Sequence, residues 1–196
     1  MKKVLSIVLA LLMMTTLMVG LLGCSKTETE TVPDESGDVV DEAPVDGAVK
    51  LVSDTVNGIT IDVPDDLSEF ADTNGIMRAK NDASTASIAI TAVNDAGGTT
   101  PETFADEETF SSTQMATFTD VQFLEFNNKA SLDGVPTVFA HTKGLNSAGV
   151  MLEIYTYIIF FEDGSFQSVV ILFSEGSNTS LQENIQAVTA SIKLAK

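Results

Sequence analysis

The sequence has few of the residues on which disulfides, metal sites and nucleic-acid binding depend. It contains one cysteine and one histidine, which excludes a disulfide framework, a cysteine-based zinc site and histidine-rich metal ligation. A single histidine also makes a Ser-His or Cys-His hydrolase hard to build. Basic residues number 10 against 28 acidic ones, and a net charge of −18 argues against nucleic acid as a partner. We therefore expect no cofactor, no metal site and no nucleic-acid partner.

The first 23 residues have the composition of a secretory signal peptide. Two lysines at positions 2 and 3 form a short positive region, and the stretch 4–23 that follows carries no charge. This pattern predicts a signal peptide over residues 1–23. An uncleaved membrane anchor is an alternative, because the apolar stretch is nearly long enough to span a bilayer.

The apolar stretch ends in Leu21-Leu22-Gly23-Cys24, which resembles the lipobox of bacterial lipoproteins. In such proteins signal peptidase II cuts before the cysteine, here between Gly23 and Cys24, and a diacylglycerol is attached to the cysteine sulfur. The only cysteine of the chain therefore stands where a thiol is needed, although an ordinary secretory signal with a spare thiol remains the alternative. Two or three acyl chains anchor firmly, since each buried methylene contributes about 0.8 kcal/mol. The predicted location is the outer face of a bacterial cell membrane, held there by the lipid.

Residues 24–49 follow as an acidic segment. Between positions 25 and 49 eight carboxylates accompany a single lysine, Lys26, and no apolar period is visible. Such composition is typical of a solvated linker, because it cannot repay the entropy of ordering. A calcium loop is the alternative, with ligands among Asp38, Asp41, Glu42 and Asp46, but their spacing lacks the order that folds oxygen ligands round one ion.

Residues 50–196 are expected to form a single globular domain. The apolar fraction of 44% with 19% charged residues is too hydrophobic for a wholly disordered chain. Alternation and turn residues such as Asn57-Gly58 and Asp133-Gly134 predict strands joined by hairpins. The expected strands are 50–56, 59–63, 75–80, 87–93, 121–130, 135–143, 150–161 and 165–173; the expected helices are 100–118 and one opened by a capping box at Ser180 and Glu183.

This order predicts an α+β domain with a central twisted antiparallel sheet flanked by helices. Sequential hairpins leave no room for parallel crossovers, which argues against a doubly wound nucleotide-binding fold. Residues 155–161 and 169–173 are apolar at successive positions, which indicates strands covered on both faces.

The stretch from Gly58 to Leu194 resembles the PsbP-like domains of secreted bacterial lipoproteins. The resemblance rests on an opening strand that ends in proline (59–64), a helix before the meander, the strand 155–161 followed by a hairpin, and the closing segment 190–194. It implies an α/β/α sandwich without a catalytic motif. Members from photosynthetic organisms are extrinsic, non-catalytic subunits of a membrane complex, and a eukaryotic relative binds a small GTPase. Neither role transfers, because a fold does not determine a function.

His141 is the first candidate for chemistry. A regular strand places it on the same face as Thr137 and Phe139. Catalysis would need a carboxylate to orient it and a nucleophile within reach, and the sequence shows neither. We interpret it as a partly exposed histidine near a strand end.

The remaining candidates are weaker. Acidic groups at Asp65-Asp66 and Asp106-Glu107-Glu108 could suggest glycosidase or metal chemistry, but solvated charges are expected throughout so acidic a chain. The glycine-containing turn at 97–100 precedes an expected helix, which is where an anion can bind. It lacks the lysine of a phosphate-binding loop. Asn178-Thr179-Ser180 matches the N-glycosylation pattern, which we interpret as accidental in a bacterial lipoprotein.

The sequence leaves three hypotheses for function. The leading one is a membrane-anchored, non-catalytic binding or accessory module for an envelope partner. The second is a lipoprotein that binds a small ligand or a divalent cation. The third is an envelope hydrolase that uses a carboxylate pair.

The lipidation hypothesis predicts that Cys24→Ala releases the protein from the membrane, because the substitution removes the only sulfur that can carry the lipid. Detergent phase partition of cells fed an alkyne-bearing fatty acid measures both anchoring and label. Ser25→Ala serves as the control and should stay labelled in the detergent phase. A Cys24→Ala protein that remains in the detergent phase would favour the uncleaved anchor instead.

Overall fold

The computed structural model describes residues 49–195 of the chain. The predicted signal peptide, the cleavage site between Gly23 and Cys24, the lipidation site and the acidic segment with its possible calcium ligands lie outside the described residues. Within the described range, no helix has the length and apolarity that a membrane crossing requires.

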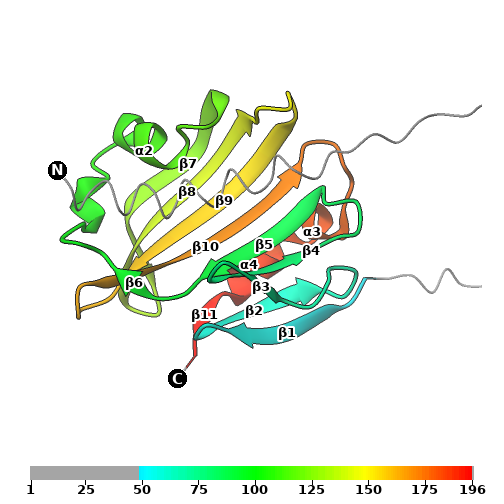
Figure 1. The fold of residues 1–196 in the computed structure, drawn as a ribbon, viewed down its shortest axis with the longest axis horizontal. Coiled ribbons are helices and arrows are strands. Elements are labelled where there is room, and N and C mark those ends of the chain that lie inside the picture. The colour runs from blue at the N-terminus through cyan, green and yellow to red at the C-terminus, as the bar shows by residue number, and fades with distance from the viewer. Residues whose placement is uncertain (1–48, 196) are drawn as a thin grey trace, which may run out of the picture.

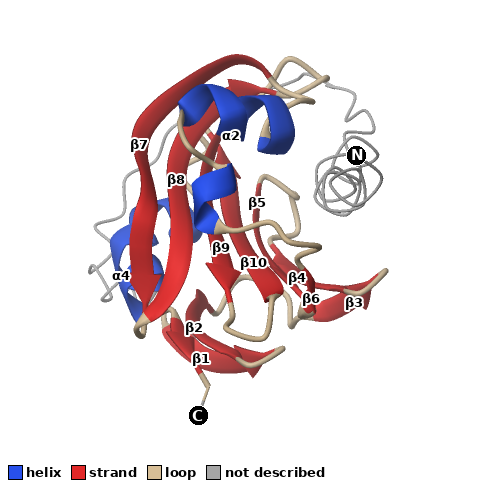
Figure 2. Cartoon of the chain, turned by 90° about the vertical axis from the view of Figure 1, so that its left-hand side faces the viewer, coloured by secondary structure: helices blue, strands red, loops and turns tan. Residues whose placement is uncertain are grey.

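The described residues form two antiparallel sheets with short helices on either side of the larger one (Figures 1 and 2). The larger sheet has the strand order β3-β4-β5-β10-β9-β8-β7, with β6 also paired to β10, and the smaller has the order β1-β2-β11. The elements are β1 Leu51–Val56, β2 Ile59–Pro64, β3 Ala71–Thr73, β4 Ile76–Lys80, β5 Ala86–Thr91, β6 Asn94–Asp95, the 3-10 turn η2 Pro101–Thr103, α2 Glu107–Gln114, β7 Thr119–Leu132, β8 Val135–Leu145, β9 Met151–Phe160, β10 Ser165–Ser174, α3 Ser180–Glu183, α4 Ile185–Ser191 and β11 Lys193–Leu194.

The predicted hairpins are present because their turn residues tolerate positive φ angles. Asn57 and Gly58 have φ values of 50° and 79°, and Asp133 and Gly134 have φ values of 51° and 86°. These values suit a tight hairpin turn whose twist matches that of the flanking strands. The antiparallel α+β class and the four-strand meander β7–β10 are confirmed.

The helix predicted over 100–118 is wrong in extent, because it is split into η2 and α2. Asp106 has extended backbone angles, and its Oδ1 accepts a hydrogen bond from the Thr109 backbone nitrogen at 2.8 Å. An aspartate side chain that caps in this way ends the preceding turn and begins a new helix.

The capping box predicted at Ser180 is also wrong. Thr179 is the cap, and its hydroxyl accepts from the backbone nitrogen of Gln182 at 3.3 Å. Ser180 occupies the first helical position and donates instead to the carboxylate of Asp66, which is distant in sequence. The expected single helix is divided into α3 and α4 at Asn184.

One face of the larger sheet packs against η2 and α2 through aromatic side chains. Phe110 of α2 is fully buried, and its ring centre lies 5.7 Å from that of Phe126, 6.0 Å from Phe123 and 5.9 Å from Phe104. Edge-to-face and tilted arrangements at such distances are favourable for aromatic pairs. This cluster joins the short helix to β7, the outermost strand of the meander.

The opposite face of the larger sheet packs against α3, α4 and the smaller sheet. The buried residues of that side include Ile59 and Ile61 of β2, Leu181 of α3 and Val188 of α4, which lie against Ile171 of β10. β10 is therefore covered on both faces, as predicted. The same prediction for residues 155–161 is only partly right, because β9 alternates between buried and part-exposed positions as far as Tyr157. The cover on this side does not extend over all of β8 and β9.

Phe110→Ala should lower the free energy of unfolding by about 3–5 kcal/mol, because it removes a fully buried ring and leaves a cavity at the centre of the aromatic cluster. Urea denaturation followed by circular dichroism measures the change. Leu124→Ala is the matched control, since Leu124 is 50% exposed, and should change the value by less than about 0.5 kcal/mol. Equal effects at the two positions would contradict the packing described.

Candidate functional site

The candidate site lies where the cover over β8 and β9 ends. Alternate residues of these strands point to the same side of the sheet as α3 and α4, and antiparallel pairing sets them opposite one another. We call this surface the aromatic face; it consists of Thr137, Phe139, His141 and Lys143 of β8 and Glu153, Tyr155 and Tyr157 of β9.

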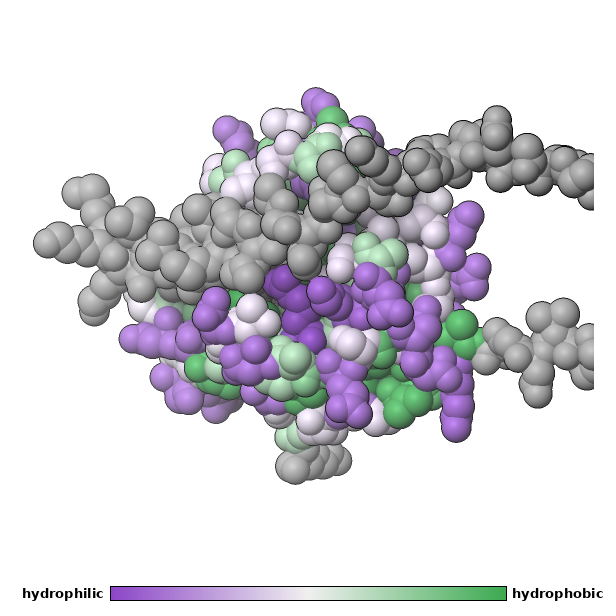
Figure 3. Space-filling view, turned by 45° about the vertical axis from the view of Figure 1, so that its right-hand side comes forward, coloured by the Kyte–Doolittle hydropathy of each residue, from purple (hydrophilic) through white to green (hydrophobic). Residues whose placement is uncertain are grey.

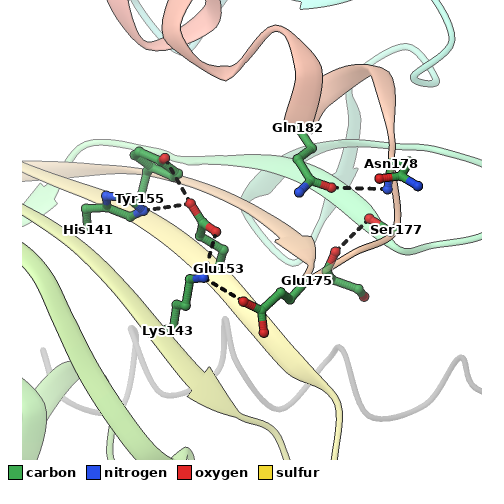
Figure 4. A network of polar contacts seen from close by, with 9 residues as sticks. His141, Lys143, Glu153, Tyr155, Glu175, Ser177, Asn178 and Gln182 are labelled. Atoms are coloured by element: carbon green, nitrogen blue, oxygen red, sulfur yellow. Dashed lines mark hydrogen bonds and ion pairs between the residues drawn. The ribbon is translucent and has the colours of Figure 1, made fainter.

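His141 lies at the centre of the aromatic face and bonds to a carboxylate (Figure 4). Its Nε2 is 2.8 Å from Oε1 of Glu153, and its ring stacks on that of Tyr155 at 3.9 Å and 17°. The Tyr155 hydroxyl donates to the same carboxylate oxygen at 3.1 Å. The side chains of His141 and Glu153 are 18% and 16% exposed, so the pair is reachable from solvent.

Two further charges extend this cluster toward the loop after β10. Lys143 Nζ lies 3.5 Å from Oε2 of Glu153 and donates to Oε1 of Glu175 at 2.6 Å. The hydrogen bond to Glu175 raises the pKa of the Lys143 ammonium, and the charge of Glu153 acts in the same direction. The cluster therefore links β8, β9 and the segment that leads to α3.

A catalytic histidine needs a carboxylate that orients it and a nucleophile within reach, and the contacts of His141 supply only the carboxylate. Glu153 holds the His141 ring in place, but in the part of the chain that the structure describes no serine, threonine or cysteine side chain bonds to that ring. The described contacts position the His141 ring but do not make it part of a nucleophilic dyad. The sequence could not reveal Glu153 as the partner, because the contact depends on the register between β8 and β9.

A small cavity of about 210 Å³ opens at the other end of the aromatic face. Phe139 and Tyr157, whose ring centres are 4.9 Å apart, form one wall. Burial raises the pKa of Tyr157 to about 12, and the nearby charge of Glu125 adds to the rise while the hydroxyl of Thr189 on α4 opposes it. The Tyr157 hydroxyl is therefore neutral at physiological pH.

The acidic groups noted in the sequence have structural roles. Asp106 caps α2, Asp66 accepts from Ser180, and Asp65 accepts from the backbone nitrogen of Lys50 at 3.2 Å. Within residues 49–195 no three histidine, cysteine or acidic side chains gather as a metal site would require. The remaining acidic residues of these groups, Glu107 and Glu108, lie exposed in the first turn of α2.

The turn at 97–100 and the glycosylation pattern at 178–180 also make hydrogen bonds with neighbouring residues of the chain. The backbone nitrogen of Gly97 donates to Oδ1 of Asp95 at 2.7 Å, so a carboxylate of the chain itself already uses the turn at 97–100. Thr179, in the glycosylation pattern, caps α3. Neither motif contributes to the aromatic face.

The largest cavity described, about 550 Å³, lies between β1 and the segment that leads to β3 and β4. It is lined by Val52, which is 48% exposed, by Phe70 and Met77, and by three carboxylates. In the view of Figure 3 hydrophobic residues gather beside the start of β1, among mostly hydrophilic neighbours. A cluster of carboxylates beside apolar walls does not define a ligand, so the aromatic face remains the better-defined site.

Comparison with known families and with curated sequences finds no match. Among solved structures, the chain is similar to the Ran-binding protein Mog1p of Saccharomyces cerevisiae, with 11% identity, a TM-score of 0.51, and coverage of 76% of this chain and 97% of that one. Cyanobacterial PsbP from Synechocystis sp. PCC 6803 gives 11% identity, a TM-score of 0.49 and coverage of 81% and 99%. LpqN of Mycobacterium tuberculosis, involved in cell envelope biogenesis, gives 12% identity, a TM-score of 0.47, and coverage of 77% of this chain and 94% of that one.

The similarity to Mog1p shows the fold and confirms the predicted class, a mostly antiparallel sheet with flanking helices. At the level of the fold, the resemblance stated from the sequence is supported by the likeness to Mog1p alone. At 11% identity it carries no function.

The two tyrosines of the aromatic face should titrate above the ordinary range. They are the only tyrosines of the chain, which has no tryptophan, so the ultraviolet absorbance of tyrosinate reports them alone. Burial raises the pKa of both, and Glu153 raises that of Tyr155 further. Because the folded state favours the neutral form, stability should fall as the pH rises from about 10 through about 12.

Glu153→Gln should lower the titration midpoint of one tyrosine, because it removes the charge next to Tyr155. Glu162→Gln, an exposed change in the turn after β9, should leave both midpoints in place. Midpoints near 10 in the unsubstituted protein would show that the aromatic face is more exposed than described.

Proposed function

We propose that this protein is a lipid-anchored, non-catalytic binding module that holds a component of the bacterial envelope against its aromatic face. The lipobox ending in Cys24 supports the anchor. The composition of residues 24–49, which predicts a solvated linker, supports a position away from the bilayer, since a linker of this length would span on the order of 25–30 Å. Anionic headgroups repel so acidic a chain.

The observation that carries the proposal is the composition of the aromatic face. Tyrosine, histidine and phenylalanine rings lie on adjacent strands as part-exposed side chains beside α4, held by the Glu153 and Lys143 contacts. Aromatic residues are enriched at binding sites because they bury a large area at low entropic cost, and pre-formed geometry reduces the cost of binding further. The face therefore suits recognition better than chemistry.

A small-ligand binder is the second candidate. The cavity beside Phe139 and Tyr157 favours it, because the cavity combines apolar walls with a few polar groups as ligand sites do. The two candidates share one surface, and they differ in whether the bound component fills the cavity or spreads over the whole face.

Photo-cross-linking in cells tests the proposal. A photoreactive amino acid at Gln122, which is exposed and pairs with Lys143 of the aromatic face, should capture an envelope component, and the same substitution at Glu183 on α3 should not. Mass spectrometry and glycan staining identify the adduct. Adding Cys24→Ala should abolish the adduct, because the protein leaves the membrane. Equal adducts from positions 122 and 183 would refute the assignment of the face.

A further inference from the structure

The cavity at the end of the aromatic face joins apolar walls to a rim of hydrogen-bonding groups. Phe139, Tyr157, Leu132 and Ala130 supply its apolar surface, and Glu125, Asn127, Ser131 and Thr137 supply the polar groups. Three strands contribute to it, because β7, β8 and β9 pair side by side there. β7 has a register irregularity between Asn127 and Ala130, two residues of the lining.

Several of these polar groups keep hydrogen-bonding capacity for a ligand. Asn127 uses its Oδ1 to accept from the backbone nitrogen of Lys129 at 2.9 Å, which leaves its Nδ2 as a donor. Thr137 is buried and donates its hydroxyl to the Val135 carbonyl at 3.0 Å, so we do not count it among the groups that a ligand can reach. Glu125 is exposed on the partner strand of His141 and brings two carboxylate oxygens as acceptors.

The charges of the lining restrict the class of ligand. Glu125 is its only ionisable group with a charge at neutral pH, and no basic side chain lines the cavity. An anionic ligand would be repelled. A quaternary ammonium could use the rings and the carboxylate, but it has no hydrogen bonds for the amide and hydroxyl groups of the rim.

The size of the cavity suits one ring of a larger molecule. Its volume of about 210 Å³ is below the roughly 300 Å³ from which sites that enclose a whole ligand begin. It corresponds to about seven water molecules at roughly 30 Å³ each. A pyranose ring has a volume of this order. It presents an apolar face of C–H groups that can pack on the aromatic wall, and its hydroxyls lie around its edge, where they can bond to the rim.

On the basis of the proposed function, we infer that this cavity binds one neutral sugar ring of an envelope glycan. The C–H face of the ring packs on Phe139 and Tyr157, and its hydroxyls bond to Asn127 and Glu125. The rest of the glycan extends along the aromatic face toward His141. The bound component of the envelope is then a polysaccharide and not a protein.

The test measures binding of neutral oligosaccharides by the mature lipoprotein in a detergent without a sugar headgroup. Titration calorimetry is performed with chitotetraose, maltotetraose and choline, and sedimentation with purified cell-wall polysaccharide. We expect at least one neutral glycan to bind. Phe139→Leu should weaken that binding roughly tenfold, since it removes the ring that the sugar face contacts.

Asn127→Asp separates recognition from folding. The aspartate keeps an acceptor for the Lys129 backbone nitrogen but loses the amide donor and places a second negative charge in the rim. Binding should fall tenfold or more with little change in the unfolding midpoint. Glu107→Gln, an exposed change on α2 at the opposite face of the sheet, should leave the affinity unchanged.

Three results would overturn the inference: no binding of any glycan offered, glycan binding that neither variant weakens, or choline binding that both variants abolish. Failure here is distinguishable from failure of the proposed function. If the cross-linker at position 122 captures a protein while no glycan binds, the binding module stands and the sugar site does not. If it captures nothing but the glycan titrations succeed, the sugar site stands without the cellular context.

Discussion

Burial of β10 on both of its faces is the constraint on which the rest of the structure depends. Nine of its backbone positions pair with β9 and five with β5, so it sits at the centre of the larger sheet. Its apolar side chains need cover on each side, which η2 and α2 supply on one face and α3, α4 and the smaller sheet on the other. Gln167, fully buried within it, donates to the carbonyls of Asn57 and Thr91 at 2.8 Å and so ties the two sheets together.

The candidate site lies on the part of this face that the helices and the smaller sheet cover least. The helices α3 and α4 have four and seven residues, and the smaller sheet has three strands. Together they are too small to cover the whole face of the larger sheet, and they pack on its central strands. The outer part of β8 and β9 is left with part-exposed rings at positions that a covered strand would fill with aliphatic side chains. Polar contacts among Glu153, Lys143 and Glu175 hold this surface in one geometry, which gives it the pre-organisation that binding requires.

The cavity and the ion-pair cluster occupy opposite ends of one surface, and Glu125 connects them. It lies opposite His141 across β7 and β8, lines the cavity, and contributes to the raised pKa values of both tyrosines. A ligand seated in the cavity as proposed would lie close to the charges of the cluster. For this reason we propose the whole face as one recognition surface.

The sequence by itself determined the features that depend on neighbouring residues. Asn57-Gly58 and Asp133-Gly134 specify their turns through local φ preferences, and alternation specifies the strands and the class of the fold. Tertiary structure decided what depends on distant contacts: Ser180 bonds to Asp66 across 114 positions, and His141 meets Glu153 through strand register. No local pattern encodes which part of a sheet its helices leave uncovered, since that follows from the packing of the whole chain, and with it the position of the site.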